Sequence, residues 1–128
     1  MDEESFLVAV ASSDGIVVNS HFGRASTFFI YEVTGSEDIR LVEQRVVSPV
    51  CEGGNHSEER LKENLLEFRD CKYLLVSRIG AGAARMAESL GMEAYEIPGV
   101  IEESITQLVK YIQVQRLFTI STCGINVI

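Results

Sequence analysis

The sequence from residue 6 to residue 15 reads Phe6-Leu7-Val8-Ala9-Val10-Ala11-Ser12-Ser13-Asp14-Gly15. An unbroken apolar run is followed at once by residues that favour turns. Such a run, short and without alternating polar residues, is typical of a β-strand that is buried on both faces. We therefore expect residues 6–11 to form a central strand of a sheet that carries helices on its faces.

The residues that follow this run predict the remainder of the sheet. Residues 16–18 form a short extended piece, and the aromatic and β-branched residues 27–33 pair with residues 39–47 as a hairpin that ends at Pro49. Further strands are expected at residues 73–76 and 92–97. Three helices are predicted, the first ending at about Arg69, the second spanning 83–90 and the third starting at Val100. Because strands separated by helices are usually parallel, we predict an α/β fold with a mixed five-stranded sheet and three flanking helices.

The end of the sequence is harder to assign. Residues 113–128 are moderately apolar and contain Cys123, so we expect a final strand or a segment that packs on a partner chain, which leaves a homodimer open. The 128 residues are expected to form one domain with a core over about residues 6–112.

Composition and charge exclude several classes of function. The net charge of −8 argues against a partner that is a nucleic acid or an anionic membrane, and no apolar run approaches the roughly 20 residues of a membrane span. The acidic segment Met1–Ser5 does not begin as a secretory signal does, so we expect a cytoplasmic protein. An anionic ligand would need a locally positive pocket on this acidic chain.

The cysteines do not predict a disulfide framework, because they are odd in number, widely spaced and never in a Cys-x-x-Cys pair. Cys71 directly precedes a strand and is expected to be a small buried residue. Cys51 and His56 flank two glycines, and both are candidate metal ligands. Cys123 is open to three interpretations, as a ligand, an exposed thiol or a packing residue.

A candidate site follows from the predicted topology. If strand 6–11 lies parallel to strand 73–76, the loops 12–24 and 78–82 meet outside the carboxyl ends of the strands, where ligands usually bind. The first loop contains His21, Gly23 and Arg24. A neutral imidazole is a good ligand for iron, Gly23 allows close approach, and Phe22 could shield a bound group from water. The alternative is a histidine that merely bonds to a backbone carbonyl.

The second loop contains Arg78, Gly80 and Gly82 at the expected start of a helix, where free N–H groups favour anions. The alternative is a tight strand-to-helix turn. A dinucleotide motif is incomplete, because Arg85 stands where its third glycine would be. The sequence also has no G-x-S-x-G or H-E-x-x-H motif, and strand 6–11 lacks the carboxylates of a magnesium nuclease.

Several of these segments together resemble the dinitrogenase iron–molybdenum cofactor biosynthesis family, which includes NifX-type carriers and the C-terminal domain of NifB. The resemblance covers about residues 6–112 and is carried by Val8–Gly15, His21–Ala25, Phe28–Val33, Cys71–Val76, Arg78–Gly82 and Gly91–Glu96. It implies a ribonuclease-H-like fold without nuclease carboxylates. It also implies binding of the iron–molybdenum cofactor or an iron–sulfur precursor, and transfer of this cluster between cofactor-assembly proteins. The radical-enzyme domain that precedes this module in NifB is not in the sequence, so we do not expect its chemistry.

The resemblance assigns roles to residues by position. It implies that His21 is a ligand or contact of the cluster, and that Arg24 and the loop Arg78–Gly82 neutralise the charge of the cluster. Cys51 is a weaker candidate. The leading hypothesis is a non-catalytic cluster carrier that serves nitrogen fixation. The first alternative is a regulatory or protein-interaction module of the same fold without a metal, and the second is a hydrolase or nuclease.

Overall fold

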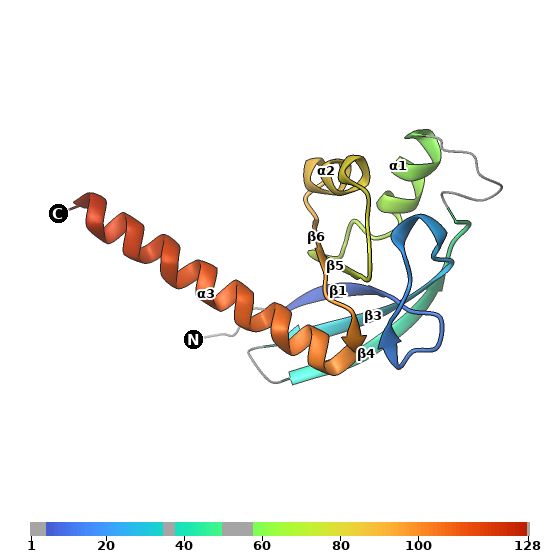
Figure 1. Cartoon of the computed structure of the whole chain (residues 1–128), viewed down its shortest axis with the longest axis horizontal. Helices are drawn as coiled ribbons and strands as arrows, with labels where there is room; N and C mark the ends of the chain where they lie inside the picture. Colours follow the sequence, from blue (N-terminus) through green and yellow to red (C-terminus); the bar gives the residue numbers. More distant parts are fainter. Residues whose placement is uncertain (1–4, 35–37, 50–57, 128) are drawn as a thin grey trace.

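The computed structural model describes residues 5–34, 38–49 and 58–127, with the backbone alone for 117–127. Its main sheet has five strands in the order β4-β3-β1-β5-β6 (Figure 1). β1 pairs antiparallel with β3 and parallel with β5, β3 pairs antiparallel with β4, and β5 pairs parallel with β6. The strands are β1 (Ser5–Ala11), β3 (Thr27–Thr34), β4 (Asp38–Val46), β5 (Tyr73–Val76) and β6 (Glu93–Glu96). The predicted mixed five-stranded sheet is confirmed.

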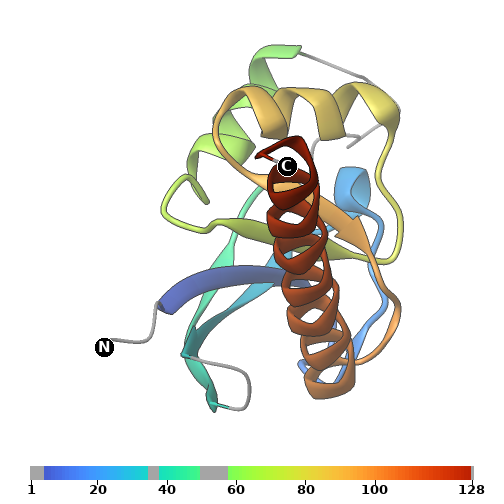
Figure 2. The same cartoon turned by 90° about the vertical axis from the view of Figure 1, so that its left-hand side faces the viewer.

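Three helices flank the sheet, as predicted: α1 (Glu58–Leu66), α2 (Ala81–Ser89) and α3 (Ile101–Val127). α1 and α2 cover one face, and α3 runs across the other (Figures 1 and 2). β1 shows why both faces need cover. Ala9 and Ala11 pack in the cluster beneath α1 and α2, whereas Val8 and Val10 pack in the cluster beneath α3. All four are fully buried, as the unbroken apolar run predicts.

A second, two-stranded sheet holds the start of α3. It pairs β2 (Val17–Val18) with β7 (Gly99–Val100), and the N–H of Ile101 donates to the carbonyl of Ile16 at 2.9 Å. The loop after β1 is thereby tied to the first turn of α3. The sequence indicated the extended piece but not its partner, because Val100 was expected to be helical already.

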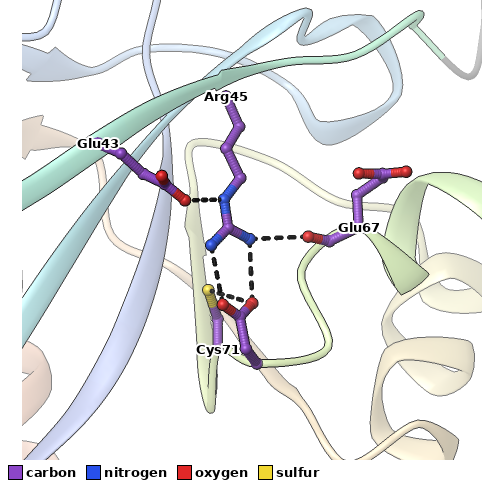
Figure 3. A network of polar contacts seen from close by, with 5 residues as sticks. Glu43, Arg45, Glu67 and Cys71 are labelled. Atoms are coloured by element: carbon purple, nitrogen blue, oxygen red, sulfur yellow. Dashed lines mark hydrogen bonds and ion pairs between the residues drawn. The ribbon is translucent and has the colours of Figure 1, made fainter.

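The edge strand β4 is fastened to the turn that follows α1 (Figure 3). The guanidinium of Arg45 donates to the carboxylates of Glu43 at 2.5 Å and Asp70 at 2.8 Å, and to the backbone carbonyl of Glu67 at 2.8 Å. It also lies 6.0 Å from the centre of the Phe68 ring, which is fully buried. These contacts raise the pKa of Arg45 and lower the pKa of Asp70.

One end of α1 and one end of α2 differ from the predictions by two residues or more. α1 ends at Leu66 rather than near Arg69, because the next N–H groups bond three residues back instead of four, as from Phe68 to Leu65. α2 begins at Ala81, two residues before the predicted Ala83, because Gly80 is the extended residue that precedes it.

Residues 113–128 were expected to form a strand or a segment that packs on a partner chain. The predicted strand is wrong. α3 continues without a break to Val127 and projects from the sheet (Figure 1). Among its residues up to Arg116, the last buried one is Ile112, and Val114 is 61% exposed. No proline interrupts residues 101–127, so nothing in the backbone ends the helix earlier. No helix in the described residues is long and apolar enough to cross a membrane.

Candidate functional site

The two predicted loops meet at the carboxyl ends of β1 and β5. His21 and Arg78 form an isolated parallel bridge, in which the N–H of Phe22 donates to the carbonyl of Arg78 at 2.8 Å. The N–H of Ser77 donates to the carbonyl of Ser20 at 3.1 Å. The predicted meeting of loops 12–24 and 78–82 is therefore confirmed. Its cause is the parallel pairing of β1 with β5, which sends both chains out at the same edge.

Phe22 anchors the first loop in the core. Phe22 is 2% exposed, and its ring centroid lies 6.0 Å from that of Phe28. The ring centroids of Phe28 and Phe68 are 4.4 Å apart. Phe22 belongs to the cluster beneath α1 and α2. The expectation that it shields a bound group is therefore wrong, because an apolar ring next to the core is more stable inside it.

A short 3₁₀ turn spans Phe22–Arg24, and His21 and Arg24 face solvent whereas Phe22 faces the core. The N–H of Arg24 donates to the carbonyl of His21 at 3.0 Å, which closes the turn. His21 and Arg24 are both exposed, and Gly23 is half-buried without a positive φ. The turn thus buries one aromatic ring and presents an imidazole and a guanidinium to solvent.

The exposed groups at this edge are polar and include the side chains of His21, Arg24 and Arg78. Among the described residues, the imidazole of His21 forms no hydrogen bond, so no backbone carbonyl of these residues accepts from it. Arg24 and Arg78 are exposed, and neither takes part in a salt bridge of the described residues. Arg24 and Arg78 bring positive charge to loops that also hold the carboxylates of Asp14 and Glu96, on a chain of net charge −8.

The second loop leads into α2 through Gly80. This N-cap residue has φ −70° and ψ 156°, and no side chain caps the N–H groups of the first turn. A Cβ added at Gly80 or Gly82 would meet nothing within 4 Å, and neither glycine has a positive φ. Neither packing nor a tight turn therefore requires glycine here, although glycine in a helix costs up to about 1 kcal/mol relative to alanine. The two glycines leave open space against the backbone, where a ligand could approach closely.

Two further residues shape the loops, and the sequence analysis did not identify them. Asn19 accepts from the N–H of Ser13 at 3.0 Å and donates to its hydroxyl at 3.0 Å, which closes the loop before His21. The carboxylate of Glu96, at the end of β6, accepts from the N–H of Ile79 at 2.8 Å. Glu96 could have been noticed as an acidic residue at the carboxyl end of a predicted parallel strand.

Asp14 lies in the same loop as Asn19 and is explained by the local backbone. Its carboxylate accepts from the N–H groups of Ile16 at 2.9 Å and Val17 at 3.2 Å, and these bonds lower its pKa. The interpretation of Asp14 as a turn residue agrees with this arrangement.

The remaining candidate ligands are not brought to this edge by the described structure. Cys71 is 2% exposed, and burial, with the charge of Asp70, raises the pKa of its thiol to about 12. It is the small buried residue that was predicted. Cys51 and His56 lie outside the described residues, and the side chain of Cys123 is not described. The described residues contain no group of three or more His, Cys, Asp or Glu side chains that could hold a metal ion.

Comparison with known proteins gives a family match. Residues 4–111 match the model of the family described as dinitrogenase iron–molybdenum cofactor. The FeMo cofactor biosynthesis protein NifB of Frankia alni is 37% identical over 82% of this chain and 21% of the relative. The NifB of Herbaspirillum seropedicae is 38% identical over 70% of this chain and 17% of the relative. The chain therefore spans about a fifth of the length of these curated relatives.

Solved structures share the fold. The crystal structure of PH0822 has a TM-score of 0.61 and 26% identity, over 81% of this chain and 88% of that protein. The NMR structure of a Thermotoga protein of the DUF35 family has a TM-score of 0.52 and 22% identity, over 86% and 89%. A third, MJ0327 of Methanococcus jannaschii, has a TM-score of 0.55 and 14% identity, over 84% and 91%. At these identities, the latter two matches show a common fold alone.

Proposed function

This chain belongs to the dinitrogenase iron–molybdenum cofactor family, and we propose that it is a non-catalytic carrier of the iron–molybdenum cofactor or an iron–sulfur precursor. The observation that carries this proposal is the backbone bridge between His21 and Arg78. It holds a potential iron ligand and a cationic side chain at one edge of the sheet. The relatives named as FeMo cofactor biosynthesis proteins support a cluster as the cargo.

His21 is the proposed protein ligand of the cluster. Its exposed imidazole can bind iron in its neutral form, and it follows directly on a segment fixed by the Ser77–Ser20 backbone bond. Cys51 and His56, in the segment that precedes α1, are proposed as further ligands.

Electrostatic contacts complete the proposed site. Arg24 and Arg78 can donate charge-assisted hydrogen bonds to sulfide or carboxylate groups of an anionic cluster. The uncapped N–H groups at Gly80–Gly82 add donors against which a ligand can lie closely, because no Cβ intervenes. Gly23 has no side chain and would let a ligand approach the backbone of the first loop. Binding, holding and release are then the whole mechanism, and we place them in the cytoplasm, with cofactor-assembly proteins as partners.

A second candidate is a regulatory or interaction module that binds a small anion and no metal. It is favoured by the lack of a metal-binding group of three or more side chains among the described residues. In that case the two arginines and the α2 N-terminus bind the anion, and replacement of His21 has little effect.

The test is anaerobic gel filtration of the protein with isolated iron–molybdenum cofactor, followed by measurement of bound iron and visible absorption. We expect co-elution for the wild type, a loss of about tenfold or more in affinity for His21→Ala, and a smaller loss for Arg24→Ala and Arg78→Ala. Arg40→Ala is the matched control, because it removes the same charge at the far edge strand, where Arg40 pairs with Glu32. No co-elution with the wild type would contradict the carrier proposal and favour the second candidate, whereas equal affinity of His21→Ala would remove His21 from the site.

A further inference from the structure

Glu96 places a negative charge directly on the loop that is proposed to hold an anion. It is the last residue of β6, and its backbone pairs with Val76, the last residue of β5. From there its side chain reaches forward to accept the N–H of Ile79 at 2.8 Å. Ile79 lies between Arg78, which bridges to His21, and Gly80, which begins the approach to α2. The carboxylate therefore contacts the centre of the second loop.

The hydrogen bond and the charge of Glu96 have separate consequences. The bond ties the second loop to β6 at Ile79, between Arg78 and Gly80. It gives the backbone N–H of Ile79 a hydrogen-bond partner. An uncharged carboxamide could accept the same bond, so the fold does not need the charge at this position. The charge weakens the attraction of Arg78 and the α2 N-terminus for any anion. Glu96 is also exposed to solvent, so its carboxylate needs no cationic partner to remain charged.

We propose that Glu96 is a positioning residue that orders the Arg78–Gly80 loop and that its charge lowers the affinity for the cluster enough to permit transfer. This inference rests on the proposed carrier function and adds a cause for release. Without a nearby carboxylate, Arg78 and the α2 N-terminus would attract an anionic cluster more strongly. The carboxylate of Glu96, which accepts from the N–H of Ile79 at 2.8 Å, limits this attraction and keeps the loop in place.

Two substitutions separate the bond from the charge. Glu96→Gln keeps an acceptor for the N–H of Ile79 and removes the charge, whereas Glu96→Ala removes both. Isolated iron–molybdenum cofactor is titrated into the wild type and each variant, at low and at high salt. Glu88→Gln, on the exposed last turn of α2, is the control for loss of one acidic charge elsewhere. Hydrogen exchange of the Ile79 amide, followed by NMR, reports the bond itself.

We expect Glu96→Gln to bind the cofactor about threefold to tenfold more tightly than the wild type at low salt, to release it more slowly and to lose this gain at high salt. We expect Glu96→Ala to bind more weakly than Glu96→Gln and to exchange the Ile79 amide faster. A merely structural residue would give Glu96→Gln the affinity of the wild type at every salt concentration, and this result overturns the inference. Binding by the wild type without any change in Glu96→Gln refutes the role of Glu96 alone, whereas no binding by the wild type refutes the carrier function as well.

Discussion

Replacement of Phe22 by alanine tests whether the loop that carries His21 is anchored through the core. The ring is 2% exposed and contacts Phe28, so its removal leaves a cavity beneath α1 and α2. Truncation of a buried phenylalanine costs about 3–5 kcal/mol. The backbone bond from Phe22 to Arg78 survives the substitution and keeps the loop near β5, so we expect a loss within this range. A domain of this size has about 5–15 kcal/mol of stability, so the variant should remain folded.

The assay is urea unfolding, followed by circular dichroism, of the wild type, Phe22→Ala and His21→Ala. His21 is the matched control, because it adjoins Phe22 in sequence but is exposed. Its replacement should change the free energy of unfolding by no more than about 0.5 kcal/mol. A loss below about 1 kcal/mol for Phe22→Ala, or an equal loss for both variants, would refute the anchoring argument.

Three further predictions concern the network at β4, the buried thiol and the start of α2. Arg45 lowers the pKa of Asp70, so this pair stabilises the protein above the ordinary carboxyl pKa of 3.8, and the effect is lost as the pH falls through the lowered pKa. Asp70→Asn should therefore cost about 1 kcal/mol at pH 7 in urea unfolding and nothing in strong acid; a cost that is independent of pH would contradict this sign. Iodoacetamide at pH 8 should label Cys71 about a hundredfold more slowly in the native protein than in urea, because burial raises its thiol pKa to about 12; mass spectrometry of the Cys71 peptide measures this, and equal rates would show an accessible thiol. Gly82→Ala should raise the free energy of unfolding by about 0.5–1 kcal/mol and weaken cofactor binding; a stabilised variant with unchanged affinity would remove Gly82 from the site.

The sheet could be predicted because its signals are local. The run Phe6–Ala11 has the composition that burial on both faces demands, and β1 has the same role in the structure. The order of strands and helices allowed β1 and β5 to be parallel neighbours, and the structure has this pairing, which brings the backbone of His21 beside that of Arg78. The edge at which two loops meet therefore follows from the strand topology, without information on any single contact.

The parts that could not be predicted depend on contacts between distant residues or on weak local signals. The contact from Glu96 to Ile79 joins residues 17 positions apart. A phenylalanine in a loop has no periodicity to show whether it faces the core, so the burial of Phe22 was missed. The continuation of α3 was missed because Val114 and the β-branched residues after it favour strands by intrinsic preference. A helix that has already formed extends through such residues at small cost.

The central claim is that His21 binds the cluster, and the most direct measurement is pulsed electron paramagnetic resonance of the loaded, paramagnetic protein with ¹⁵N-labelled histidine. The chain has two histidines, so a His56→Gln variant leaves His21 as the single source of an imidazole nitrogen signal. We predict a ¹⁵N coupling to the cluster that persists in His56→Gln and disappears in the double variant His21→Gln/His56→Gln. A loaded His56→Gln protein without any imidazole coupling would contradict the claim.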